Sequence, residues 1–392
     1  MTDSTKDNRN DGGKEQKKRG GKLKSFLLFV LTLVLVLAVV VIAAYRDGTG
    51  FDVLRRYFNY GRAEQSAEAG YDYDASPQNH FVALGDTLVI MSDTSLQVQR
   101  RGGDVMWETA LRMEAPALVS GGGRAVAYDV GGTELYILDE NGLVDQLTVD
   151  EEEPLIAVTL NEQAWMAVTA KKENYKACVS VYNAELEKMF DFNSSRRFVS
   201  DAYVTDDCKF VAAVTLGQEN SVFVSEVVLY DLTQTDPVAN YGVADGLVLQ
   251  IGQQGEYLTA VADNKLTMAG TDGTVKGEYG YGAAFLREYD LGGDGYTVLL
   301  LNRYQSGNVG RLITVGTDGT ELASLEVNDE VRSLSAAGRY IAVLYTDSLV
   351  VYNQDLQTYA TLKGTGYAKA ALVRNDGSAL LISAESARLF LP

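Results

Sequence analysis

The chain has 392 residues, enough for one large domain or two or three smaller ones, and its 46% hydrophobic and 22% charged residues are typical of globular proteins. Its formal net charge of −19 argues against nucleic acid as a partner, because phosphate binding needs a basic surface. The single histidine, His80, excludes metal sites built from several histidines.

The first 24 residues are polar and basic, with eight Lys or Arg against four acidic residues. A segment this poor in apolar residues cannot bury a core. Residues 1–24 are therefore predicted to be a disordered tail.

Residues 25–45, "SFLLFVLTLVLVLAVVVIAAY", carry no charge. As a helix they would span about 30 Å, the thickness of the hydrocarbon core of a bilayer. We expect a transmembrane anchor here, with a cleaved signal peptide as the alternative. Five Lys or Arg in the ten residues before Ser25, against two in the ten after Tyr45, predict a cytoplasmic N-terminus and an extracytoplasmic body.

Residues 46–70 are interpreted as a juxtamembrane linker. Within it, 50–62 would place Phe51, Leu54, Tyr57 and Phe58 on one face of a short amphipathic helix. Such a helix could lie among lipid headgroups or pack on the base of the following domain.

The remainder of the chain repeats one phrase, an alternating apolar run that ends at a polar turn, as in "LVVYNQDLQ" at 349–357 and "CVSVYNAEL" at 178–186. Each run of this kind is typical of a β-strand entering a hairpin. The positions that follow these runs are Arg100, Asp139, Asn183, Asp231, Gly270, Gly316 and Asn353, spaced by 39, 44, 48, 39, 46 and 37 residues. Such spacing indicates an internal repeat.

Each repeat also contains a nearly all-apolar strand, such as "TLVIM" or "RYIAVLY", that suits burial on both faces. Three or four strands in each of eight periods predict an all-β, eight-bladed β-propeller over residues 71–392. Seven blades with 71–111 folded differently, or a two-sheet sandwich array, are the alternatives. The last repeat lacks an outer strand, so we expect 71–75 to pair with 387–391 and close the ring.

Two resemblances follow from these repeats. "GGDVMWE" at 102–108 is similar to a phrase of quinoprotein-like propellers, although only the first repeat has this Trp. The whole layout resembles an uncharacterised Firmicute family of single-pass, membrane-anchored, WD40-like propellers, classed as a domain of unknown function. The resemblance implies a fold and a membrane location and carries no catalytic residues across.

No catalytic constellation is recognised, and no cofactor or metal is expected. "DENG" at 139–142 and "GTDG" at 270–273 and 316–319 contain calcium-type oxygens but lack EF-hand spacing, so we interpret them as hairpin turns. Cys178 and Cys208 fall in neighbouring repeats, so a disulfide between them is geometrically possible. We expect two free thiols, since a large core needs no disulfide. His80 is interpreted as a surface residue.

The sequence therefore predicts a non-enzymatic binding or scaffold module for a protein or a cell-envelope ligand. The alternative is an extracytoplasmic enzyme, glycan-acting or quinoprotein-like, with a carboxylate site in the central channel. The oligomeric state is left open. The candidate binding surface consists of five aromatic residues: Tyr279, Tyr281, Phe285, Tyr289 and Tyr296.

Overall fold

The computed structural model describes residues 20–47, 52, 56–57, 70–244 and 246–392. The chain divides into two compact units, Met1–Gly61 and Arg62–Pro392. The N-terminal unit contains helix α1 (Gly20–Asp47). Residues 1–19 of the predicted tail and most of the predicted linker lie outside the described residues.

Helix α1 begins earlier than the sequence led us to expect. Residues 20–24 belong to the helix rather than to a disordered tail, since Lys and Leu are good helix formers that extend an adjoining helix. The described side chains of residues 26–40 are exposed, among them Phe26 (64%) and Leu28 (69%). Across the described ranges, no helix combines the length and the apolarity that a membrane crossing requires. The transmembrane helix expected over residues 25–45 is thus not found within the described ranges.

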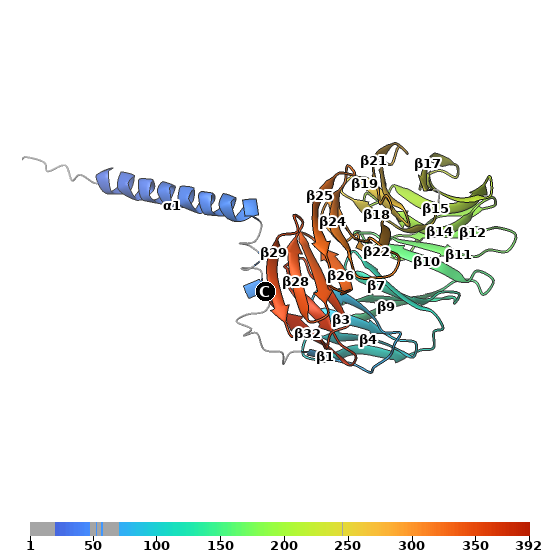
Figure 1. Ribbon diagram of the computed structural model, residues 1–392, viewed down its shortest axis with the longest axis horizontal. Coiled ribbons are helices and arrows are strands. Elements are labelled where there is room, and N and C mark those ends of the chain that lie inside the picture. The colour runs from blue at the N-terminus through green and yellow to red at the C-terminus, as the bar shows by residue number, and fades with distance from the viewer. Residues whose placement is uncertain (1–19, 48–51, 53–55, 58–69, 245) are drawn as a thin grey trace, which may run out of the picture. The chain divides into compact units, whose positions relative to one another are not determined.

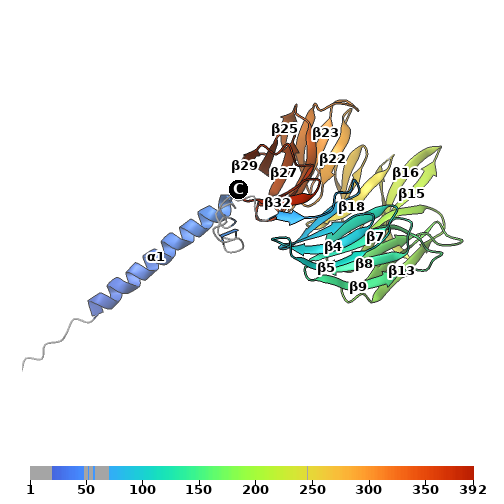
Figure 2. The same cartoon turned by 90° about the horizontal axis from the view of Figure 1, so that it is seen from below.

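The second unit consists of eight four-stranded antiparallel sheets, which confirms the all-β, eight-bladed propeller (Figure 1 and, turned by 90°, Figure 2). Sheet 1 contains β2 (His80–Leu84), β3 (Thr87–Met91), β4 (Ser95–Arg100) and β5 (Val105–Ala110), and sheet 2 contains β6 (Pro116–Gly121), β7 (Arg124–Asp129), β8 (Glu134–Asp139) and β9 (Gly142–Thr148). Sheet 3 contains β10 (Leu155–Leu160), β11 (Met166–Ala170), β12 (Ala177–Tyr182) and β13 (Lys188–Ser194), and sheet 4 contains β14 (Phe198–Val204), β15 (Phe210–Glu219), β16 (Val222–Asp231) and β17 (Pro237–Ala244).

The remaining sheets repeat this order. Sheet 5 contains β18 (Val248–Gln254), β19 (Tyr257–Ala262), β20 (Lys265–Ala269) and β21 (Val275–Gly280), and sheet 6 contains β22 (Phe285–Asp290), β23 (Tyr296–Asn302), β24 (Gly310–Gly316) and β25 (Glu321–Val327). Sheet 7 contains β26 (Val331–Ala337), β27 (Tyr340–Tyr345), β28 (Ser348–Asn353) and β29 (Thr358–Lys363). Sheet 8 contains β30 (Ala370–Val373), β31 (Ala379–Ile382), β32 (Ser386–Phe390) and β1 (Gly70–Asp72).

Sheet 8 combines strands from both ends of the unit, so that blue β1 lies beside red β32 in Figure 1. The two strands are antiparallel, with Tyr71 opposite Ala387 and Asp72 opposite Ser386. The N-terminal strand ends at Asp72, before the end of the segment 71–75 that the sequence indicated. Tyr73 continues the contact through hydrogen bonds from its N–H to the carbonyl of Glu385 and from its hydroxyl to the carbonyl of Ser383.

A buried cluster lies between each pair of neighbouring sheets, and eight such clusters cover all eight junctions. The junction between sheet 8 and sheet 1 contains Tyr71, Leu88 and Leu380, all fully buried. Because a four-stranded sheet has two faces, only neighbours on both sides can remove it from water. The junction between sheets 8 and 1 is as well buried from solvent as the other seven, so the ring of sheets is closed.

Burial is greatest on the second strands and smallest at the rim of the unit. First strands of successive sheets contact one another, as β10 does with β14 and β26 with β30, so they line the middle. Second strands such as β3 and β23 are buried at every position, as their apolar sequences predicted. Fourth strands such as β21 and β29 are largely exposed, which places them outermost.

The turn sequences behave as hairpin turns. Gly273 and Gly319 adopt positive φ (77° and 81°), and the carboxylates of Asp272 and Asp318 accept hydrogen bonds from the N–H groups of Thr274 and Thr320. In the two phrases that contain Tyr-Asn, the equivalent positive-φ positions are held by leucines, Leu186 (65°) and Leu356 (56°). A leucine is strained there. Leu356, 8% exposed, packs into the cluster between sheets 6 and 7.

Candidate functional site

The sheets give the unit two unequal faces. Strands alternate in direction within each sheet, so the turns between second and third strands open on the same side as the connections between sheets. We call this side the connector face. Its segments are 73–79, 92–94, 111–115, 130–133, 149–154, 171–176, 195–197, 220–221, 246–247, 263–264, 281–284, 303–309, 328–330, 346–347, 364–369 and 383–385.

Exposed apolar side chains gather on the connector face. Apart from fourth strands and the N-terminal unit, every large hydrophobic side chain that is exposed in the described part of the chain lies on this face or at the strand ends that border it. These residues are Val130, Tyr175, Phe198, Val222, Phe223, Leu247, Leu249, Phe285, Tyr304 and Tyr367. Six of them are aromatic, and Phe223 (61%) and Tyr304 (62%) are the most exposed. Aromatic side chains concentrated on one surface are characteristic of protein interaction sites.

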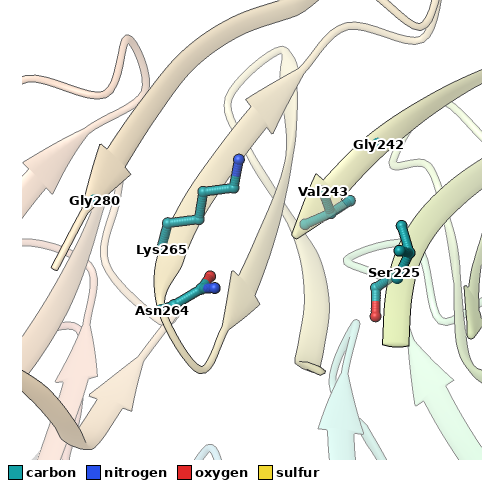
Figure 3. Close-up of a pocket in the computed structure, with 7 residues that line it drawn as sticks. Ser225, Gly242, Val243, Asn264, Lys265 and Gly280 are labelled. Atoms are coloured by element: carbon teal, nitrogen blue, oxygen red, sulfur yellow. The ribbon is translucent and has the colours of Figure 1, made fainter. Parts of the chain in front are cut away.

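Two pockets open near this face on either side of the end of β21, and Gly280 lines both. The Lys265 pocket, between sheets 4 and 5, has a volume of about 510 Å³. Figure 3 shows Asn264 and Lys265 on one side of it and Ser225 and Val243 on the other. Its polar groups are engaged within the protein: Lys265 Nζ lies 2.6 Å from Glu278 Oε1, and Ser225 Oγ donates to the carbonyl of Gly246 at 2.7 Å.

The Tyr281 pocket, between sheets 5 and 6, has a volume of about 270 Å³. Leu301 and Ile313 give it an apolar side, and Tyr279, Tyr281, Arg303, Arg311 and Glu326 bring polar atoms. The structure therefore brings Tyr279 and Tyr281 together in one pocket, and Phe285, 45% exposed, begins the adjoining strand β22.

Of the other two predicted surface aromatics, Tyr296 is buried and Tyr289 is only partly exposed. Tyr296 is 1% exposed in the cluster between sheets 6 and 7, where its hydroxyl donates to the carbonyl of Tyr340 at 3.3 Å. Tyr289 is half-buried on first strand β22 and packs against the cluster between sheets 5 and 6. Both tyrosines pack their rings against buried clusters between sheets, so they contribute to packing rather than to a binding surface.

Three carboxylates lie on first strands and were not singled out from the sequence: Asp201 on β14, and Glu288 and Asp290 on β22. Burial raises the pKa of Asp201 to about 7 and that of Glu288 to about 7, and it also raises the pKa of Asp290. Perturbed carboxylates of this kind often mark active sites. The recognisable signal was an acidic residue inside a predicted first strand, as in "SDAY" and "REYD".

Each of these carboxylates accepts hydrogen bonds from the next first strand. Asp201 accepts from the N–H of Ile251 at 3.4 Å, Asp290 from that of Ala336 at 3.0 Å, and Glu288 from that of Leu334. They therefore connect neighbouring sheets.

The hydroxyls of Ser333 and Ser335 act similarly, accepting from Ala371 and Val373 of β30. Within the described ranges no three His, Cys, Asp or Glu side chains form a group that could hold a metal ion.

The remaining candidates have plain structural roles. Cys178 and Cys208 are both free thiols, and His80 is exposed at the start of β2.

A family model described as "Family of unknown function (DUF5711)" matches residues 57–360. No curated protein matches the chain significantly. The computationally designed Ika8 protein superposes with a TM-score of 0.60 and 11% identity, covering 83% of this chain and 100% of that one.

Two natural proteins of known structure are similar in the same way. The C-terminal WD40 domain of Sif2 has a TM-score of 0.59 and 15% identity, with 83% and 98% coverage of the two chains. BamB from Moraxella catarrhalis has a TM-score of 0.52 and 13% identity, with 82% and 98% coverage. At these identities the similarity concerns the fold alone.

Proposed function

The chain belongs to the Family of unknown function (DUF5711), and from its structure we propose that it is a non-enzymatic binding or scaffold module whose connector face docks a macromolecular ligand. The observation that carries the proposal is the concentration of exposed aromatic side chains on one face of an otherwise regular ring. Rigid propellers with this organisation present loop-built surfaces. The similarity to WD40 and BamB propellers supports this class of function.

The ligand is proposed to be a protein or a cell-envelope polymer. Tyr and Phe supply large contact areas at a small cost in conformational entropy, which suits either ligand. The strongly acidic composition disfavours nucleic acid, as the sequence indicated.

An enzyme acting through the central carboxylates is the weaker alternative. Asp201, Glu288 and Asp290 have the raised pKa values that general acids need. However, each is already hydrogen-bonded to the backbone of a neighbouring sheet. This arrangement favours a structural role.

The location is proposed from the sequence. The charge-free segment 25–45 and the five basic residues before it favour a single-pass anchor with a cytoplasmic N-terminus and an extracytoplasmic propeller. The Firmicute origin implied by the resemblance is part of the same proposal. Alkaline extraction of membranes from expressing cells tests the membrane anchor. A full-length protein released into the supernatant contradicts anchoring.

Photo-crosslinking tests the docking face. A photoreactive phenylalanine derivative replaces Phe223 or Tyr304 on the connector face, and Lys209 on the opposite face is the control. We expect adducts from the first two positions only. Peptides of a second protein in the mass spectrum of the purified adduct identify a protein ligand, and a mass shift that glycan hydrolases remove identifies a polymer. Equal adducts from all three positions, or none from any, contradict the proposal.

A further inference from the structure

The Tyr281 pocket contains a buried polar group that no part of the described structure satisfies. Tyr281 is 5% exposed, and its hydroxyl has no hydrogen-bond partner among the described residues. Leaving a buried hydroxyl unpaired is unfavourable, and native proteins rarely do so without a bound group to complete the contact. The phenol lines a pocket of about 270 Å³, which is room for roughly nine water-sized volumes.

The other polar groups of this pocket are mostly paired with one another. Tyr279 donates its hydroxyl hydrogen bond to Glu321 at 2.7 Å, and Arg311 contacts the same carboxylate at 2.7 Å. Arg311 also lies 3.9 Å from Glu326. These contacts engage Glu321 and Glu326 without involving Tyr281 or Arg303, while Asp263 acts on Tyr281 only electrostatically.

Arg303 is the second unused group. It lies in the turn 303–309, lines the pocket and is exposed, and in the described part of the chain it forms no ion pair. A guanidinium is permanently charged and matches the geometry of a carboxylate. The pocket therefore offers one neutral donor and one cation beside the apolar side chains of Leu301 and Ile313.

We propose that the Tyr281 pocket binds a small group with an apolar body and a carboxylate, which accepts a hydrogen bond from the Tyr281 hydroxyl and pairs with Arg303. The phenol stays protonated at neutral pH, because burial raises its pKa well above its ordinary value. The apolar body contacts Leu301 and Ile313. The assignment deepens the proposed function and rests on it for the natural ligand, since the pocket borders the connector face.

The probe is 3-phenylpropionate, titrated into the full-length protein and followed by ligand-observed NMR. For a ligand of this size we expect a Kd on the order of millimolar. The neutral amide of the same acid and glucuronate serve as comparison probes for the charge and for the apolar body. We expect saturable binding of 3-phenylpropionate and at least about tenfold weaker binding of both comparison probes.

Variants locate the binding. Tyr281→Phe and Arg303→Gln are each expected to weaken binding about tenfold. Tyr241→Phe is the matched control, since Tyr241 is also 5% exposed with an unpaired hydroxyl but does not line this pocket. Tyr281→Phe should leave the melting temperature unchanged or raise it, because it deletes an unsatisfied hydroxyl.

Three results overturn the proposal: no saturable binding of 3-phenylpropionate, equal binding by Tyr281→Phe and wild type, or comparison probes that bind as well as the acid. Probe binding needs no macromolecular partner. Its failure is therefore distinct from a failure of the docking face, which the crosslinks at Phe223 and Tyr304 report.

Discussion

Replacing Asp201 by asparagine should reduce the loss of stability that the protein undergoes as the pH rises from 5 to 8. Burial raises the pKa of this carboxyl to about 7, whereas in an unfolded chain it is close to 3.9. Between about pH 4 and pH 7 the folded protein holds a proton that the unfolded chain has released. Raising the pH through this window therefore lowers the free energy of unfolding, and the stabilising protonation is fully lost above pH 7.

The size of the effect follows from the two pKa values. A difference of about three units corresponds to about 4 kcal/mol over the whole window, and about 2–3 kcal/mol of this falls between pH 5 and pH 8. Asparagine does not ionise and keeps one acceptor oxygen, so one of the two hydrogen bonds from the N–H groups of Ala202 and Ile251 is lost at every pH. The stability of Asp201→Asn relative to wild type should accordingly rise by about 2–3 kcal/mol from pH 5 to pH 8.

Urea unfolding of the full-length protein at several pH values measures this difference. Both proteins share the pH dependence of stability that comes from charge repulsion within a chain of net charge −19, so this contribution cancels in the difference between variant and wild type. Asp272→Asn is the control, because hydrogen bonds from Thr274 lower the pKa of Asp272, so its contribution to stability changes only below about pH 4 and its difference from wild type should stay constant from pH 5 to pH 8. A pH-independent difference between Asp201→Asn and wild type would refute the reasoning.

Three further changes test the packing. Tyr71→Ala should cost about 3–5 kcal/mol in urea unfolding, because it empties a fully buried site and removes the hydrogen bond to the carbonyl of Asp86; an unchanged midpoint would contradict the closed ring. Gly319→Ala should lower the melting temperature more than Gly282→Ala, since its Cβ would lie 2.7 Å from the backbone nitrogen of Glu278 whereas Gly282 has open space; equal effects would argue against this contact. Leu356→Gly should be no less stable than Leu356→Ala in calorimetry, because glycine relieves the positive φ; a clearly less stable glycine variant would show that the strain is small.

The repeat made the fold predictable. Its period and its all-apolar second strands come from local sequence, and together they require neighbours on both faces. The turn chemistry was equally local, as in "GTDG" at 270–273. The number of blades followed because the spacing of the phrases left no large unassigned segment.

The site was less predictable, because face and depth are properties of the assembled ring. Tyr281 and Tyr296 have the same side chain, yet Tyr281 lines a pocket whereas Tyr296 is buried in the cluster between sheets 6 and 7. Phe223 and Tyr304, far apart in the chain, share one face only because the strands alternate. The role of Asp201 depends on the backbone of β18, which no local pattern reveals.

The pairing of β1 with β32 also fixes when the protein can be completed. A ribosome makes β1 first and β32 last, so the first strand of the unit waits for some 300 residues of synthesis before its partner exists. Until then the apolar surfaces of sheets 1 and 7 have no neighbour to cover them. The ring can therefore close only after β32 has been made and has paired with β1.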